Sequence, residues 1–549
     1  MKSSALFTTA VLVFTGLTVL GFLNLGQKNF WASHAESRRA DIARNMIKTG
    51  DYIVPRVNDK VILTKPPLYY WALAASFKIN GKATEASARV PSAIAGVATA
   101  MVVFLIGFAL FDSLTAVLAV AVLSTSYLFS FFLRFAELDM LFTFFITLSF
   151  YFLIRLYQNP DRPKKWGFCF WLSAALGFLV KGPFALLYPI GAFMLVLPFG
   201  KNRSSFAKSF FNLPGIAVFM IIVLPWFVYV YLYTGAGAIF AEEVAQRITD
   251  SRGKDHSPFF YLESLVNFSP WLIVLPFALF RAINLEIKRS GLILAWLIGG
   301  VVIASLISAK NHHYILPLYP AMALLTGRYV AVHLKGGLND NYMLESITGW
   351  LGIFISFLVF LTLAILPFAP RFTTEVPPLY PYMNAGLVVV CAFLFATALR
   401  FYRGRNFTGL WISVITGLFI TLIFAHAFVV PKLNSRNSHK NFLVNIRKIV
   451  DRQNPLRMYK IENFQTTFYL DRSAPALWNK NDLDKFVKTI NQEDAKGYLI
   501  TKKRFLVEAL KISGGKTRMI DNYFIPHTAS KGGNRFVLIE VDRGKKDKL

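Results

Sequence analysis

Runs of about 20 apolar residues recur through the first four-fifths of this 549-residue sequence. Each run is long enough to cross a hydrocarbon layer of about 30 Å as a helix. The first run, residues 5–25, is too long for the core of a signal peptide and lacks a convincing cleavage site, so it is expected to be a retained span. With 55% hydrophobic and only 16% charged residues, the chain is too apolar for an ordinary soluble protein. The sequence predicts a polytopic α-helical membrane protein.

About thirteen transmembrane helices are predicted from these runs. They cover residues 5–25, 91–111, 114–132, 141–156, 167–180, 184–199, 214–233, 270–280, 292–308, 315–329, 346–368, 384–399 and 408–430.

Five short loops between the spans are rich in Lys and Arg, and all five fall on one side of the membrane. They are residues 155–165, 201–208, 281–289, 328–335 and 400–405. Basic loops stay in the cytoplasm, so the N-terminus is expected there as well. An odd number of spans then places the long loops 26–90 and 234–269, together with the tail, in the periplasm of a bacterium.

The predicted domains are a transmembrane domain, residues 1–430, and a small soluble periplasmic α/β domain, residues 431–549. The tail contains 25 Lys and Arg against 12 Asp and Glu. It has no RNA-binding signature, so its expected partner is an anionic lipid or glycolipid surface and not a nucleic acid.

Disulfide and metal chemistry are not suggested by the two cysteines. Cys169 and Cys391 both fall inside predicted spans, and neither has metal-ligand spacing. His312 and His313 are adjacent and would not face the same way, so no metal site is predicted from them.

The first long loop combines a charged amphipathic segment, residues 31–50, with Lys65 beside Pro66 and Pro67. The segment fits a helix in the membrane interface or an ordinary surface helix with solvated charges. The two prolines stiffen the loop at Lys65. This lysine could therefore bind a lipid phosphate, or simply extend its ammonium group to the interface.

Further charged groups lie at the same predicted side of the membrane. Residues 134–140, RFAELDM, place Glu137 and Asp139 near Arg134 at a span end. Such groups are costly at a hydrocarbon boundary unless they are functional or paired with one another. A Lys181-Gly-Pro turn and the segment 308–321 add further cations. The centres of the spans have few polar residues, which disfavours a transporter.

These motifs resemble the GT-C superfamily of polyprenyl-phosphate-sugar glycosyltransferases, especially the aminoarabinose transferases of lipid A and, more distantly, the protein O-mannosyltransferases. The motifs that carry the resemblance are Glu36 and Arg38, Gly50-Asp51-Tyr52, Pro55 to Asp59 with Arg56, Thr64 to Leu68, Asp139, Lys181 to Pro183, and Ser308 to Pro317. Two positions depart from the family pattern. Ala35 stands where the family has its first Asp, and Thr64 stands where it has Glu before the lysine.

The resemblance implies a GT-C fold and transfer of a sugar, such as an aminosugar, from a polyprenyl phosphate to lipid A or a related envelope glycolipid. The expected location is the periplasmic face of the bacterial inner membrane. Alternatives are a protein O-mannosyltransferase-like enzyme, a lipid-linked sugar transporter or flippase, and a non-catalytic lipid-binding protein. No cofactor is assigned, and a divalent metal is left open because Thr64 replaces an acidic residue.

The expected site residues divide by charge. Asp139 and Glu36 are the candidate catalytic carboxylates, which would act as base, orient the acceptor, or stabilise positive charge on the sugar. Cations would stabilise the leaving phosphate. The candidate donor-binding residues are Lys65, Arg56, Arg38, Lys181, Lys310 and Tyr314. Loss of the acid at position 35 favours a phosphate acceptor over a hydroxyl acceptor, because a phosphate is already anionic.

Overall fold

The computed structural model describes residues 3–30, 35–58, 60–63, 65–158, 163–199, 203–234, 257, 259–306, 310–336, 342–365, 379–431, 438–492, 496–512, 517–523 and 536–541. Its contacts divide the chain into two compact units. The first contains residues 1–25, 64–69 and 89–428, and the second contains residues 26–63, 70–88 and 429–549. The predicted tail therefore shares a unit with most of the first long loop.

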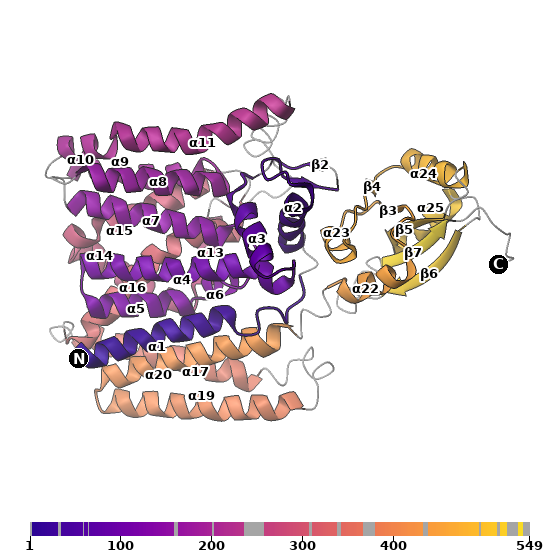
Figure 1. The fold of residues 1–549 in the computed structure, drawn as a ribbon. Helices are drawn as coiled ribbons and strands as arrows, with labels where there is room; N and C mark the ends of the chain where they lie inside the picture. The colour runs from indigo at the N-terminus through magenta and orange to yellow at the C-terminus, as the bar shows by residue number, and fades with distance from the viewer. Residues whose placement is uncertain are drawn as a thin grey trace. The chain divides into compact units, whose positions relative to one another are not determined.

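The first unit is a bundle of helices (Figure 1). Its N-terminal half contains α1 (Ser3–Phe22), α4 (Glu85–Leu110), α5 (Ser113–Thr125), α6 (Tyr127–Phe132), α7 (Asp139–Gln158), α8 (Pro163–Lys181), α9 (Phe184–Val196), α10 (Arg203–Phe210) and α11 (Leu213–Thr234). The first four residues of α4, before Arg89, belong to the second unit. Its C-terminal half contains α13 (Phe260–Ser264), α14 (Leu275–Asn284), α15 (Ile287–Ser305), the 3-10 segment η4 (His312–Leu318), α16 (Tyr319–Leu334), α17 (Tyr342–Ile365), α19 (Leu379–Arg403) and α20 (Phe407–Phe424). Short 3-10 turns η1 (Leu197–Phe199), η2 (Leu265–Phe268) and η3 (Trp271–Ile273) and a π turn η6 (Ala425–Val429) complete it.

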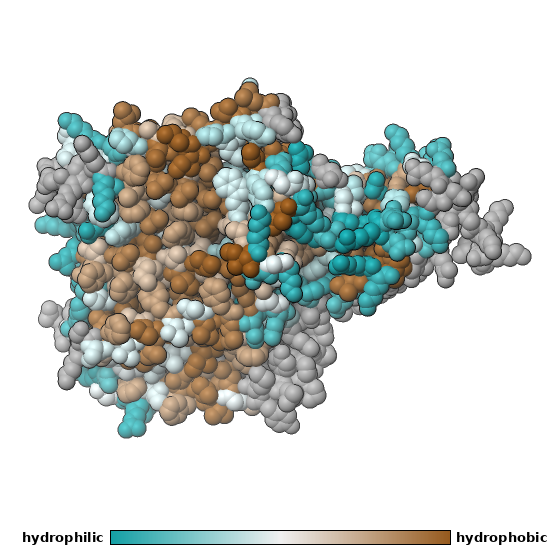
Figure 2. Space-filling model, viewed as in Figure 1, coloured by the Kyte–Doolittle hydropathy of each residue, from teal (hydrophilic) through white to brown (hydrophobic). Residues whose placement is uncertain are grey.

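Apolar side chains cover most of the face of this bundle that Figure 2 shows, as expected for contact with lipid. Phe108 is 59% exposed, Ile221 70% and Phe393 67%. Inside, small residues allow close helix contacts. A Cβ atom at Gly327 of α16 would lie 2.5 Å from the Ala119 amide nitrogen of α5. The polytopic helical membrane fold is therefore confirmed.

The predicted number of thirteen spans is not confirmed. In the described part of the chain, nine helices are long and apolar enough to cross a membrane, or ten if one bent pair is a single span. The predicted span 114–132 breaks at Ser126, between α5 and α6. The predicted span 270–280 is the second limb of the bent pair, which turns by 116°. α9 is apolar but has only 13 residues.

Cations and carboxylates lock several helix ends together at one end of the bundle. Arg328 of α16 donates two hydrogen bonds of 2.9 Å to the Glu286 carboxylate and one of 2.9 Å to Asp112. Arg281 and Lys335 add ion pairs of 3.0 Å to Glu286 and 2.9 Å to Asp112. The N-terminus, α10 and α14 also lie at one end of the bundle in Figure 1, so several predicted basic loops share an end.

The second unit contains a five-stranded sheet with the order β4-β3-β5-β7-β6. The strands are β3 (Leu456–Tyr459), β4 (Ala476–Leu477), β5 (Gly497–Lys502), β6 (Thr517–Tyr523) and β7 (Phe536–Val541). β3 is parallel to β4 and β5, whereas β7 is antiparallel to β5 and β6. The helices are α22 (Lys440–Ile449), α23 (Phe464–Leu470), α24 (Lys480–Gln492) and α25 (Lys503–Ile512). Leu483 and Ile490 of α24 pack against Leu499 and Val537 of the sheet, which forms a small core.

The first long loop contributes α2 (Ala35–Thr49), the hairpin of β1 (Arg56–Val57) and β2 (Lys60–Val61), and α3 (Leu68–Ile79) to this unit. Only the first two residues of α3 belong to the first unit. α2 contacts α23. Arg44 of α2 donates to the carbonyl oxygens of Thr467, at 2.7 Å, and Phe468, at 2.5 Å, and its guanidinium pairs with Asp471 at 3.0 Å. A surface helix with solvated charges is therefore the wrong interpretation of residues 35–49, because the charged side chains of this helix pack against the tail.

Candidate active site

A buried ion pair joins two of the predicted site residues in the first unit. Asp139 begins α7, and Lys181 ends α8 just before Gly182, whose φ of +74° turns the chain. The Lys181 Nζ atom lies 2.5 Å from Asp139 Oδ1, and the two side chains are 7% and 3% exposed. α7 and α8 pack side by side, so the antiparallel helices bring these two residues to the same end.

The segment η4 supplies the next two side chains of this cluster. His313 Nε2 lies 3.8 Å from Asp139 Oδ2. The Lys181 ammonium lies 4.4 Å from the centre of the Tyr314 ring, a distance that allows a cation–π contact. The Tyr188 hydroxyl donates a hydrogen bond of 3.1 Å to the Tyr314 carbonyl oxygen, which anchors η4 to α9.

Lys65 adds a second ammonium group to the electrostatic surroundings of Asp139. Its charge acts on both the Asp139 carboxylate and His313. Glu137 also acts on His313. Lys310, at the start of the segment that leads into η4, donates to the Ser257 carbonyl oxygen at 3.4 Å. We call Asp139, Lys181, His313, Tyr314 and Lys65 the Asp139 cluster.

Arg134 has a different role from the pairing considered above for residues 134–140. Its guanidinium donates to the carbonyl oxygens of Leu20 and Leu23 near the end of α1, at 2.5 and 2.6 Å. Arg89 likewise donates to the Leu25 carbonyl oxygen at 3.0 Å. These arginines satisfy carbonyl groups that the end of a helix leaves without partners. The cationic partner of Asp139 is Lys181.

Three other predicted site residues belong to the second unit. Glu36 of α2 is fully buried. The Arg38 guanidinium lies 5.7 Å from the centre of the Phe464 ring. Arg56 Nε lies 3.7 Å from Asp51 Oδ2, with 30% of the Arg56 side chain exposed. The structure therefore brings Asp139, Lys181, Tyr314 and Lys65 together, and places Glu36, Arg38 and Arg56 in a separate unit. Thr64 lies outside the described residues.

The chemistry around Asp139 does not fit a divalent metal ion. Among the described residues, no three His, Cys, Asp or Glu side chains are grouped as metal ligands. Asp139 is instead surrounded by lysine ammonium groups, which repel a metal ion and attract an anion. The cluster is suited to an anionic ligand such as a lipid phosphate.

His313 is the residue of the cluster that the sequence did not assign to the site. In the sequence, its position next to His312 argues only against a two-histidine metal site. In the structure the two imidazoles separate, and His312 Nδ1 makes a hydrogen bond of 2.8 Å with Ser264 Oγ. The sequence feature that could have indicated His313 as a site residue is its position at a predicted membrane edge, next to the candidate donor-binding residue Tyr314.

Comparisons with known proteins show that this fold resembles that of membrane glycosyltransferases of the GT-C type. A family model described as dolichyl-phosphate-mannose-protein mannosyltransferase matches residues 64–229. The structure of ArnT from Cupriavidus metallidurans bound to undecaprenyl phosphate superposes with a TM-score of 0.76 and 19% identity, and covers 96% of this chain and 97% of that one.

Two proteins are similar to this chain in sequence over most of its length. An undecaprenyl phosphate-alpha-4-amino-4-deoxy-L-arabinose arabinosyl transferase from Pectobacterium carotovorum is 27% identical over 81% of both chains. An uncharacterised protein of Aquifex aeolicus is 29% identical, over 84% of this chain and 87% of its own length. The predicted resemblance, the fold and the enzyme class are thereby confirmed.

Proposed function

We propose that the protein transfers a sugar, such as aminoarabinose, from a polyprenyl phosphate to lipid A or a related envelope glycolipid. The reaction takes place at the periplasmic face of the inner membrane, and the Asp139 cluster is its centre. The observation that carries this proposal is the buried Asp139–Lys181 pair, with His313 beside it and the charge of Lys65 acting on Asp139. The named transferases among the relatives support the choice of donor and acceptor.

The cations of the cluster serve the leaving group. During transfer the bond between the sugar C1 and the donor phosphate oxygen breaks, and its electron pair stays on that oxygen. Fixed cations stabilise the resulting charge, and loss of one commonly costs on the order of 10²–10³ in rate. Lys65 and Lys181 are the two cations of this cluster that can serve this role.

Asp139 serves the sugar. A carboxylate held against an ammonium group stays ionised, so it is a poor general acid but a good partner for positive charge. Glycosyl transfer passes through an oxocarbenium-like state, in which the ring carries that charge. The acceptor oxygen then bonds to C1. If the acceptor is a phosphate, it is already anionic and needs no base, which fits Ala35 in place of the family's Asp.

Transfer by the purified protein in detergent, with undecaprenyl-phosphate aminoarabinose and lipid A, tests this proposal. Asp139→Asn should abolish transfer because it removes the charge and keeps the shape. Glu36→Gln should be milder, since a phosphate acceptor needs no base. Binding of undecaprenyl phosphate, measured in parallel, separates loss of chemistry from loss of folding. Full activity in both variants would rule out this placement of the active site.

A second candidate, mannosyl transfer to protein, follows from the family model that matches residues 64–229. The same assay with polyprenyl-phosphate mannose and a Ser/Thr-rich peptide decides between the two. A hydroxyl acceptor needs a base. If the peptide is mannosylated and the Glu36→Gln variant is inactive, the acceptor is a protein hydroxyl and not a glycolipid.

A further inference from the structure

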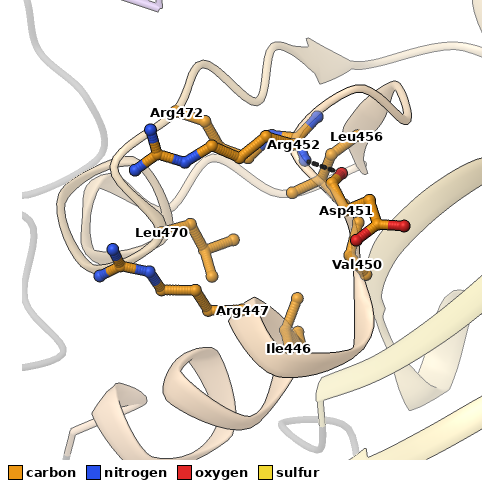
Figure 3. Close-up of a pocket in the computed structure, with 8 residues that line it drawn as sticks. All are labelled: Ile446, Arg447, Val450, Asp451, Arg452, Leu456, Leu470 and Arg472. Atoms are coloured by element: carbon orange, nitrogen blue, oxygen red, sulfur yellow. Dashed lines mark hydrogen bonds between the residues drawn. The ribbon is translucent and has the colours of Figure 1, made fainter.

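A cavity of about 170 Å³ lies within the second unit, between the end of α22 and the residues that flank α23. Its apolar floor is made of Ile446, Val450, Leu456 and Leu470 (Figure 3). The volume is below the roughly 300–1,000 Å³ of a site for a whole organic ligand. The cavity is therefore of a size for one head group.

Three arginines, Arg447, Arg452 and Arg472, line this cavity together with a single carboxylate, that of Asp451 (Figure 3). A second pocket of the unit shares Arg472 and is lined by Asp41, Arg44 and Lys48 as well. We call the first of these the arginine pocket. Its lining groups carry a clear excess of positive charge.

The contacts of the three guanidinium groups leave donors unused. Arg472 donates to the carbonyl oxygens of Asp451, at 2.9 Å, and Asn454. Arg452 donates to Asp471 at 3.2 Å. Arg447 is exposed and makes no hydrogen bond or ion pair with any residue that the structure describes. Since a guanidinium has five N–H donors, each arginine retains donors for a ligand.

Like charges also crowd this end of the unit. Burial lowers the pKa of the Arg472 guanidinium, and the charges of Arg457 and Arg452 lower it further. Bringing guanidinium groups together costs free energy unless an anion offsets the repulsion. Guanidinium groups bind phosphate through paired hydrogen bonds. A terminal phosphate carries about −1.5 to −2 charges near neutral pH, which is opposite in sign to the positive charge that the three arginines retain beside Asp451 and Asp471.

We propose that the arginine pocket binds a terminal phosphate group, either free phosphate or the phosphomonoester head of a lipid. The apolar floor accommodates the uncharged part of the head group, and the arginines hold the phosphate oxygens. This site is separate from the Asp139 cluster, since its residues all belong to the second unit. Its occupancy does not depend on whether the protein transfers a sugar.

Equilibrium dialysis of radiolabelled inorganic phosphate against the full-length protein in nonionic detergent tests this proposal. Arg447→Ala removes an arginine that supports no other described residue, so folding should be unchanged. It should weaken phosphate binding on the order of tenfold, the usual effect of losing one charge-assisted hydrogen bond. Lys448→Ala is the matched control, because Lys448 is exposed on the same helix and does not line the pocket. It should change binding less than about twofold.

The Asp139 cluster is also expected to bind a phosphate group, so a further variant is needed to distinguish binding there from binding in the arginine pocket. Lys65→Ala should leave the arginine-pocket component unchanged, whereas Arg447→Ala should weaken it on the order of tenfold. Titration with dihexanoyl phosphatidic acid, and with dihexanoyl phosphatidylcholine as the lipid without a terminal phosphate, distinguishes a lipid head from the free ion. Tighter binding of phosphatidic acid than of phosphate identifies a lipid, and the reverse identifies the ion. No saturable component sensitive to Arg447→Ala, or equal weakening by Lys448→Ala, would overturn the proposal.

Discussion

At Asp139 a negative charge is stabilised away from water by the ammonium group of Lys181. The two side chains are 3% and 7% exposed. Removing charged groups from water costs several kcal/mol per ion, so a pair like this one contributes little net stability. Removing one partner is different, because the remaining charge is left buried and unpaired. The pair is therefore explained better by chemistry than by stability.

A double-mutant cycle separates these two roles. Lys181→Met alone should destabilise the protein by about 3–5 kcal/mol and abolish transfer. Adding Asp139→Asn should recover much of that stability, because no buried charge remains, and should recover no activity. Thermal unfolding in detergent and donor turnover are the measurements. Recovered activity in the double variant would show that the pair is structural.

Lys65 gives a second test at this scale. Lys65→Ala should reduce donor turnover on the order of 10²–10³, because it removes a cation near the leaving phosphate. The unfolding temperature should barely change, since an interfacial loop lysine contributes little to packing. Near-normal turnover by a folded variant would remove Lys65 from the site.

At the scale of elements, Arg328 joins three helix ends. Its guanidinium pairs with Asp112, in the turn between α4 and α5, and with Glu286, in the turn between α14 and α15. Arg328→Met should lower the free energy of unfolding by roughly 1.5–3 kcal/mol, since hydrogen bonds to charged groups are lost. Arg328→Lys should lower the free energy of unfolding by a smaller amount, because an ammonium group keeps the charge but cannot form the paired contact. Lys288→Ala, an exposed change at the start of α15, is the control for the unfolding measurement.

The same network gives a pH dependence. Burial would raise the pKa of Asp112, but the Thr115 amide and Lys335 hold it below 3.8. Burial would likewise raise the pKa of Glu286, but Arg328 and Arg281 hold it below 4.5. Folded values below the unfolded ones mean that the stabilisation is complete above about pH 4.5 and is lost as the pH falls further. Unfolding temperatures measured on both sides of pH 4.5 should show this loss, and the double variant Asp112→Asn, Glu286→Gln should show less of it.

The helices were easier to predict from the sequence than the long-range contacts between them. Apolar runs and ordered motifs predicted the helices and brought Asp139 and Lys181 to one side, because these signals are local. The break at Ser126 was missed because it depends on a distant contact, the hydrogen bond of 3.0 Å from the Tyr127 amide to the Ser269 carbonyl oxygen. The burial of α2 was missed for the same reason. Its amphipathic pattern indicates a covered face, but Phe468, which accepts from Arg44, is 424 positions away.

At the scale of the whole molecule, the orientation in the membrane is a prediction from the basic loops. A reporter that is active only in the periplasm should be active when fused after Leu549. The same reporter inserted at Asn159 should be silent, because that loop is expected in the cytoplasm. Membrane insertion of both fusions is checked by alkaline extraction. The reverse pattern would move the Asp139 cluster to the cytoplasmic side and exclude a periplasmic reaction.

The second unit is built from two parts of the chain that leave the ribosome at different times. Glu85 accepts from Lys440 at 2.6 Å and from the Tyr469 hydroxyl at 3.0 Å, so residues of the first long loop bind residues of the tail. Translation at about 5–20 residues per second separates Ala88 from Val429 by roughly 20–70 seconds. During that interval α2 and its charged side chains lack the partners that bury them. A chain terminated early would insert most of its spans but leave α2 open to proteases, so degradation can distinguish incomplete chains from complete ones.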